Sequence, residues 1–217
     1  MVTFENFLEN EEKEEYFKKL RTFLDLEEKN YKIIPDSLYI YKAMNLTPFS
    51  NTKVIIVGDD PYPNSLHATG LAFSTNEGYI PRSLNNIFRE YVDDLGFIYP
   101  KNGDLTKWAN EGVLLMNRIL TTRDKVSLAH KKKGWEIFTL NYIKLLNREK
   151  NNLVFILWGK NAYSLKDYID ANRHLVLVSS HPSPLSARIS FFKSRPFSQA
   201  NNYLKANGIG TIDWRLS

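Results

Sequence analysis

The sequence predicts an α/β fold of three layers, α/β/α, in which a central four-stranded parallel sheet is flanked by helices. Four short apolar runs are each long enough for a buried strand, and they occupy residues 53–58, 112–117, 152–159 and 174–180. Their hydrophobicity is continuous rather than alternating, which is typical of parallel strands that are covered on both faces. Helical patterns separate the runs, and strands that alternate with helices favour this layered class.

The helical patterns lie between the strands and at the start of the chain. Residues 7–29 have a loosely helical spacing of apolar positions, and further helices are expected in 83–96, 135–150 and 161–173. The first of these three stops at Gly96, a residue type that commonly ends helices. No internal repeat, low-complexity tract or linker is visible, so residues 1–217 are expected to form a single domain with an acidic helical segment at 1–30.

Composition excludes several classes of protein. The 217 residues include no cysteine, so disulfides and thiolate metal sites are excluded. No apolar run approaches the ~20 residues of a membrane span, and the acidic start lacks the basic region of a signal peptide. We therefore expect a soluble protein without a membrane partner, located in the cytoplasm, or in the nucleus if the source is eukaryotic or viral.

Charge is distributed unevenly along the chain. Residues 1–30 carry five Lys and Arg against nine Asp and Glu, whereas the remaining residues carry 24 against 15. A body this basic is compatible with a polyanionic partner such as nucleic acid, although a lysine-rich surface alone explains the same numbers.

The four predicted strands all end in polar residues or glycine. The first leads to Asp59 and Asp60, the second to Asn117, the third to Gly159 and Lys160, and the fourth to the segment that holds His181. Ligands of such sheets bind beyond the carboxyl ends of the strands. Asp60, Asn117 and His181 are therefore expected to converge on one rim, although polar strand ends are common in any α/β protein.

Other chemistries fit these residues less well. A pair of aspartates can hold magnesium for phosphoryl transfer, but the phosphate-binding pattern GxxxxGK[ST] is absent. The four histidines have no zinc-protease spacing, and no GxSxG pattern supports a serine nucleophile.

The segment 179–201 carries the most specific signal. It places His181 and Leu185 on a loop stiffened by Pro182 and Pro184, and basic residues follow. A rigid tip with an apolar side chain suits a wedge into a base stack, with cations to bind phosphates. The alternative is that Leu185 packs inward and the prolines only shape a turn.

Together these segments resemble the family 1 uracil-DNA glycosylases, which hydrolyse uracil from DNA during base-excision repair. GDDPYPN (58–64) is similar to the water-activating loop of that family, and GLAFS (70–74) to its uracil-stacking segment. GVLLMNRILTTR (112–123) resembles the run that contains its uracil-reading asparagine, and HPSPLSARISFF (181–192) its DNA-intercalation loop. GWEIFT and the terminal IDW also match. The resemblance extends from about residue 31 to 214, with its motifs in the order of the family.

The resemblance implies a role for each matching residue. Asp60 is the expected catalytic carboxylate, which orients the water and stabilises positive charge on the sugar, and His181 donates a hydrogen bond to uracil O2. The expected uracil-binding residues are Asp59 (through its backbone N–H), Tyr62, Phe73 and Asn117. The expected DNA-binding residues are Ser83, Lys160, Ser183, Leu185, Ser186 and Arg188. Read without the resemblance, each aromatic residue is equally compatible with the core.

The resemblance also implies partners and limits. It predicts a monomer that acts on uracil in single- or double-stranded DNA without cofactor or metal, with a uracil-glycosylase inhibitor protein as a further partner. Asp59 and Pro63 depart from the family pattern, which has glutamine and histidine there. Two aspartates side by side should raise the pKa of one of them. A DNA-binding homologue with weakened catalysis that serves a replication complex, a glycosylase for another base and, more remotely, a magnesium-dependent nuclease therefore stay open as alternatives.

Overall fold

The computed structural model describes residues 2–76 and 78–216. Its centre is a parallel sheet with strand order β3-β2-β5-β6. The strands are β2 (Val54–Gly58), β3 (Val113–Asn117), β5 (Val154–Trp158) and β6 (Leu175–Ser179). All residues of β2, β3 and β5 are buried, which confirms the continuous apolar runs as strands of a covered parallel sheet.

Strand β6 differs from the other three. It pairs only with β5, so it forms an edge of the sheet, and most of its residues are only partly buried. Val178 is 43% exposed. Burial on both faces was therefore the wrong expectation for this strand. The other edge strand, β3, is fully buried, so the exposure of β6 reflects weaker cover by the surrounding elements and not its edge position alone.

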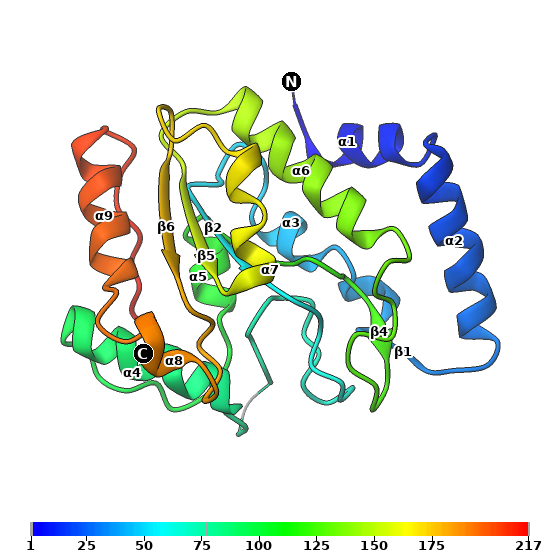
Figure 1. Ribbon diagram of the computed structural model, residues 1–217, viewed down its shortest axis with the longest axis horizontal. Helices are drawn as coiled ribbons and strands as arrows, with labels where there is room; N and C mark the ends of the chain where they lie inside the picture. Colours follow the sequence, from blue (N-terminus) through cyan, green and yellow to red (C-terminus); the bar gives the residue numbers. More distant parts are fainter. Residues whose placement is uncertain (1, 77, 217) are drawn as a thin grey trace.

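Helices cover both faces of the sheet. Figure 1 shows α9 (Pro196–Ala206) on one side and α6 (Trp135–Glu149) with α7 (Lys160–Tyr163) on the other. Helix α4 (Arg82–Leu95) packs against α9. The predicted three-layer α/β/α architecture with a four-stranded parallel sheet is therefore confirmed.

Two of the predicted helices have nearly their expected limits, and one does not form as predicted. Helix α4 ends at Gly96, which is in the left-handed conformation (φ 69°) and donates its N–H to the Val92 carbonyl. The expected helix at 161–173 is wrong, because the chain forms only the short α7 and the 3₁₀ turn η2 (Lys166–Tyr168). A polar side chain there forms a hydrogen bond with the local backbone: Ser164 Oγ donates to the Asn161 carbonyl. Such side-chain hydrogen bonds compete with a continuous helix.

The acidic N-terminal segment is helical, as expected, and forms two helices. Helices α1 (Phe4–Glu11) and α2 (Glu15–Glu28) lie outside α6, as Figure 1 shows. Their apolar side chains join the same cluster of buried residues as the sheet, and Phe17 is fully buried against Trp135 and Phe138.

The remaining elements are short. They are β1 (Ile33–Ile34), η1 (Ser37–Tyr39), α3 (Lys42–Leu46), α5 (Thr106–Asn110), β4 (Thr122–Arg123) and α8 (Ala187–Ser190). Strands β1 and β4 form a separate antiparallel pair. Among the described helices, none combines the length and the apolar character that crossing a membrane requires.

Candidate active site

A cavity of about 170 Å³ opens at the carboxyl end of the sheet. It brings together residues that are up to 123 positions apart, as expected for the carboxyl ends of neighbouring parallel strands. The predicted site residues that line it are Asp59, Asp60, Tyr62, Phe73, Ser83, Asn117 and His181.

The protein holds the Asp60 carboxylate through only one of its two oxygens. Ser127 Oγ and the Leu128 N–H both donate to Oδ2, at 2.9 and 2.6 Å. Burial raises the pKa of the Asp60 carboxyl above its ordinary value; the two hydrogen bonds oppose this rise and the charge of Asp59 adds to it. The site thus holds a desolvated carboxylate with a fixed orientation.

The side chain of Asp59 has its own partner. Its Oδ1 accepts a hydrogen bond from Asn161 Nδ2 at 3.0 Å, and its carbonyl accepts one from the Ile119 N–H. Asp59 also borders a second cavity of about 100 Å³, which it shares with the partly buried Arg118. Burial lowers the pKa of the Arg118 guanidinium, and the Asp59 charge opposes that shift. The second aspartate therefore has a polar partner and a nearby cation.

The imidazole of His181 has a defined tautomer. The Ser183 N–H donates to its Nδ1 at 3.0 Å, so a neutral ring carries its proton on Nε2. Burial lowers the pKa of His181, with Asp59 opposing the shift, and this favours the neutral ring. Gly159 (φ 88°) allows the close approach of this loop, since a Cβ there would lie 2.8 Å from the His181 Cβ. His181 therefore presents a hydrogen-bond donor without a full charge.

The side-chain amide of Asn117 occupies the space that a side chain at Gly58 would fill. Asn117 ends β3 and is 8% exposed, next to Gly58 in the register of β2 and β3. A Cβ on Gly58 would lie 2.2 Å from Asn117 Oδ1, so only glycine leaves room for the amide. No described residue hydrogen-bonds the Asn117 side chain, which leaves its donor and its acceptor free for a ligand.

Two rings complete the cavity. Phe73 has a left-handed backbone (φ 64°), and its ring packs edge-on against Trp158 at 5.5 Å and lies 5.9 Å from the ring of His181. Trp158 in turn packs edge-on against Phe191. Tyr62 donates its hydroxyl to the Phe73 carbonyl at 3.3 Å, and burial raises the pKa of its phenol. Both rings are thus fixed at the cavity wall instead of free in solvent.

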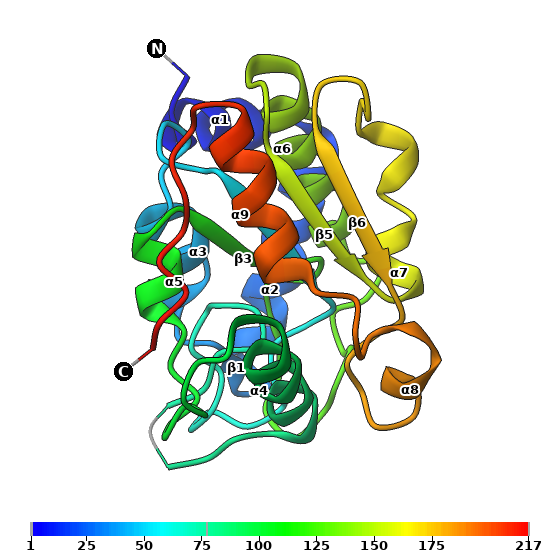
Figure 2. The ribbon, with the colours of Figure 1, turned by 90° about the vertical axis from the view of Figure 1, so that its left-hand side faces the viewer.

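The other predicted DNA-binding residues lie outside the cavity. Leu185 is 96% exposed at the tip of the loop before α8, and Lys160 and Arg188 are exposed as well. Ser186 Oγ donates to the His181 carbonyl and Ser183 Oγ accepts from the Leu185 N–H, so both serines shape the loop. Figure 2 shows α8 beyond the carboxyl ends of β5 and β6. The alternative in which Leu185 packs inward is therefore wrong.

Sequence reasoning missed several residues that shape the site. Ser127 and Leu128 hold Asp60, Asn161 holds the Asp59 side chain, and Gly58 makes room for Asn117. Only Gly58 carried a signal, because glycine is depleted within strands and often marks a close approach. Among the described residues, no group of three or more His, Cys, Asp or Glu side chains is arranged to hold a metal ion.

Comparison with known proteins identifies the family. The model of the uracil DNA glycosylase superfamily matches residues 44–205. The chain belongs to this superfamily. It is 46% identical over 212 residues to a uracil-DNA glycosylase of Clostridium beijerinckii, covering 97% of this chain and 94% of the relative. It is 48% identical over 210 residues to that of Fusobacterium nucleatum, covering 96% and 93%.

Solved structures of the superfamily have the same fold. The crystal structure of mimivirus uracil-DNA glycosylase superposes with a TM-score of 0.92 at 30% identity, over 97% of this chain and 85% of that chain. A variant of the mimivirus enzyme in complex with UGI gives a TM-score of 0.92 at 31% identity, over 97% and 87%.

Proposed function

We propose that this protein is a uracil-DNA glycosylase of family 1, which flips uracil out of DNA and hydrolyses its N-glycosidic bond. The observation that carries the proposal is the set of groups on one cavity: the Asp60 carboxylate, the His181 donor and the free Asn117 amide. A protein that only binds DNA has no need for all three. Membership in the superfamily supports the same reaction.

Asp60 acts on the sugar and the water. As the glycosidic bond breaks, positive charge develops on the deoxyribose, and an ionised carboxylate beside it lowers the energy of the transition state. The same carboxylate orients the water that attacks the sugar carbon. The donors at Oδ2 support this role, since hydrogen bonds to the charged form favour ionisation against the effect of burial.

His181 acts on the leaving base. Uracil departs with negative charge on its ring, and a donor aimed at O2 stabilises that anion. The hydrogen bond from the Ser183 N–H to Nδ1 supports this role because it leaves the proton on Nε2. The backbone N–H groups of Asp59 and Asp60 add to the same oxyanion site. One donor of this kind is typically worth roughly 3–4 kcal/mol in the transition state.

Asn117, Phe73 and Tyr62 select the base. A fixed amide can accept from uracil N3–H and donate to O4, whereas cytosine presents the opposite pattern. The Phe73 ring stacks on the flipped base, supported by its packing against Trp158. Tyr62 fills the space beside uracil C5, where the methyl group of thymine would collide.

The exposed loop and the cavity rim hold the DNA. Leu185 enters the gap that the flipped nucleotide leaves, and the side chains of Lys160 and Arg188 offer positive charge to the phosphates. The DNA backbone is contacted by three serines, Ser83, Ser183 and Ser186. For Ser183 and Ser186, the hydrogen bonds within the loop support a role in keeping the loop in the shape that meets the DNA.

The remaining parts of the proposal concern the whole protein. It acts as a monomeric single domain inside the cell, on single- and double-stranded DNA, and needs no cofactor. The mimivirus relative was solved in complex with UGI, and we extend such inhibition to this protein.

The proposal is tested by release of free uracil from a uracil-containing oligonucleotide in EDTA, with a matched thymine oligonucleotide beside it. We expect uracil release with no loss in EDTA, and no release of thymine. DNA binding without release of either base would contradict the proposal and favour the DNA-binding homologue, whereas release that requires added metal would favour a metal-dependent enzyme.

A further inference from the structure

The Asp60 carboxylate receives asymmetric support from a distant segment. Ser127 Oγ and the Leu128 N–H, 67 and 68 positions along the chain, both donate to Oδ2. No described residue donates to Oδ1. One oxygen is therefore held by the protein, and the other is left for water and substrate.

The segment that provides these donors has a constrained backbone. Lys125 and Leu128 both lie in the left-handed region, at φ 66° and 58°, where side chains with a Cβ are strained. The Lys125 N–H donates to the Pro63 carbonyl, in the same loop as Asp60. The Thr122 hydroxyl bonds two backbone groups of the segment: it donates to the Val126 carbonyl and accepts from the Ala129 N–H. Strain that persists in this way requires support from the surroundings.

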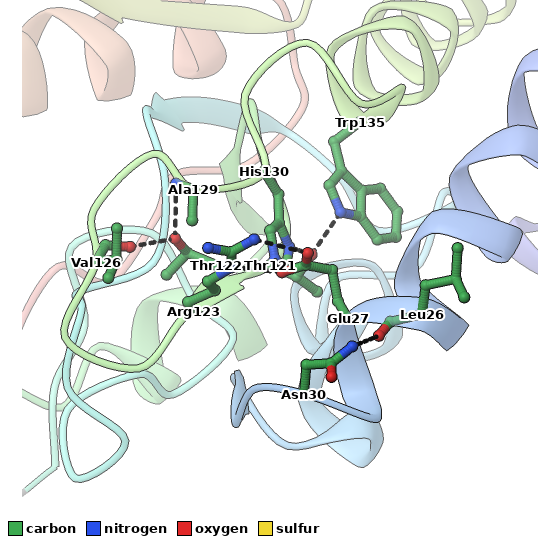
Figure 3. A network of polar contacts seen from close by, with 10 residues as sticks. All are labelled: Leu26, Glu27, Asn30, Thr121, Thr122, Arg123, Val126, Ala129, His130 and Trp135. Atoms are coloured by element: carbon green, nitrogen blue, oxygen red, sulfur yellow. Dashed lines mark hydrogen bonds and ion pairs between the residues drawn. The ribbon is translucent and has the colours of Figure 1, made fainter.

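That support comes from helix α2. Arg123 donates twice to the Glu27 carboxylate, at 2.5 and 2.7 Å, and its guanidinium lies 3.7 Å from the centre of the Tyr31 ring. At the other end of the segment, the buried His130 Nε2 lies 3.4 Å from Glu27 Oε2, close enough for an ion pair but without hydrogen-bond geometry. Figure 3 shows Arg123 and His130 gathered around Glu27.

A second polar group fixes the far end of the segment. Thr121 Oγ1 accepts a hydrogen bond from Trp135 Nε1 at 2.6 Å and lies 2.8 Å from His130 Nδ1. Thr121 Oγ1 therefore links the indole of Trp135 to the imidazole of His130 (Figure 3). Both ends of the segment 123–130 are thus anchored, and Ser127 and Leu128 lie between them.

We propose that Ser127 is a positioning residue for the reaction. Its hydroxyl and the Leu128 N–H hold Oδ2 of Asp60, so that Oδ1 alone faces the water and the sugar. The segment 123–130, anchored to Glu27, keeps both donors in place. This proposal rests on the proposed catalytic role of Asp60 and deepens it.

A pH profile separates positioning from general packing. The titratable and charged groups that share the cavity with Asp60 are Asp59, Tyr62, His67 and His181, and none of them is changed by a substitution at Ser127. A hydrogen bond to the ionised carboxylate favours ionisation, so its loss raises the pKa of Asp60. Because the reaction needs the ionised form, the acidic limb of kcat/KM then moves to higher pH.

The test compares Ser127→Ala with Ser127→Thr, which keeps the hydroxyl, and with Ser50→Ala as a surface control. For Ser127→Ala we expect the acidic limb to move up by roughly one pH unit and kcat on the plateau to fall about tenfold. Ser127→Thr should restore both values, and Ser50→Ala should match the wild type. A uniform loss with an unmoved acidic limb, or no loss at all, would overturn the proposal.

A measurement without substrate separates this proposal from the proposed function. The Asp60 carboxyl carbon is titrated by NMR in the wild type and in Ser127→Ala, and its midpoint is expected to rise in the variant. An unmoved midpoint would overturn the positioning role, whereas failure of the wild type to release uracil would overturn the proposed function. Glu27→Gln, with the exposed neighbour Glu28→Gln as its control, should speed exchange of the Leu128 amide; equal exchange in both would contradict the anchoring.

Discussion

Gly58 shows how one missing side chain shapes the cavity. A Cβ at this position would lie 2.2 Å from Asn117 Oδ1 and 3.0 Å from the Ala72 Cβ. Contacts that short cannot persist, so the amide would have to move. Displacement of a reacting or recognising group by about 1 Å can cost on the order of 10²-fold in rate.

We therefore predict that Gly58→Ala lowers kcat/KM for uracil release by about 10²-fold, because Asn117 is displaced. Gly208→Ala is the matched control, since its Cβ meets open space although its φ of 70° makes the substitution strained. The control should lose some stability and keep its activity. Wild-type activity in Gly58→Ala would show that the Asn117 amide does not read the base.

At the same scale, the sequence identified which polar residues meet and not how they are held. Asp60, Asn117 and His181 were predicted to converge because they follow parallel strands, and the structure places them on one cavity. The partner of Asp59 is Asn161, which lies 102 positions away in a segment that was expected to be helical. Side-chain hydrogen bonds of this kind depend on the tertiary arrangement and leave no pattern in the sequence.

At the scale of elements, the loop before α8 is held at its base by hydrogen bonds and exposes its tip to solvent. Pro182 is buried and its carbonyl accepts a hydrogen bond from Asn86 Nδ2 in α4, while Ser186 bonds the His181 carbonyl. Leu185 remains 96% exposed at the tip. An apolar side chain held in water by a fixed loop is suited to insertion into another molecule.

We predict that Leu185→Ala reduces uracil release from duplex DNA about tenfold or more, with a smaller effect on single strands. Only the duplex has a stack that must be opened and filled, at a cost of a few kcal/mol. Ile189→Ala is the matched control, because Ile189 is 77% exposed on the neighbouring α8. Equal losses on both DNA forms would argue against the wedge.

Helices and strands could be predicted where the local sequence pattern and the tertiary packing favour the same structure. The buried strands β2, β3 and β5 have continuous apolar runs, and α4 has both an apolar stripe and Gly96 as its end. Helix α9 was missed, although Pro196 stands at its start and its buried residues recur at helical spacing. Its boundaries depend on Asp94, which accepts the Phe197 and Ser198 N–H groups from another helix.

At the scale of the whole molecule, the acidic N-terminal segment packs into the same core as the sheet. Phe17 is fully buried and contacts Trp135 and Phe138 on α6. Glu27 accepts a hydrogen bond from Arg123 in β4. These contacts favour one cooperative unit over a separate tail.

We predict that Phe17→Ala lowers the free energy of unfolding by about 3–5 kcal/mol, because it removes a ring from a packed site. Thermal unfolding should keep a single transition at a lower temperature. The exposed Leu26 on the same helix provides the control, and Leu26→Ala should change stability by no more than about 0.5 kcal/mol. Two separate transitions, with the second at the wild-type temperature, would contradict the single unit.

The two adjacent aspartates provide the decisive comparison for the whole mechanism. Asp60 is held through Oδ2 at the cavity, whereas the side chain of Asp59 is bonded to Asn161 and lies near Arg118. A carboxylate that acts on the sugar cannot be replaced by an amide, but one that contributes its backbone can.

The measurement is single-turnover release of uracil by Asp60→Asn and Asp59→Gln, with binding to the same DNA measured in parallel. We expect Asp60→Asn to lose at least about 10³-fold in rate while it still binds DNA, and Asp59→Gln to stay within about tenfold of the wild type. Comparable turnover in Asp60→Asn, or an equally severe loss in Asp59→Gln, would contradict the assignment of Asp60 as the catalytic carboxylate.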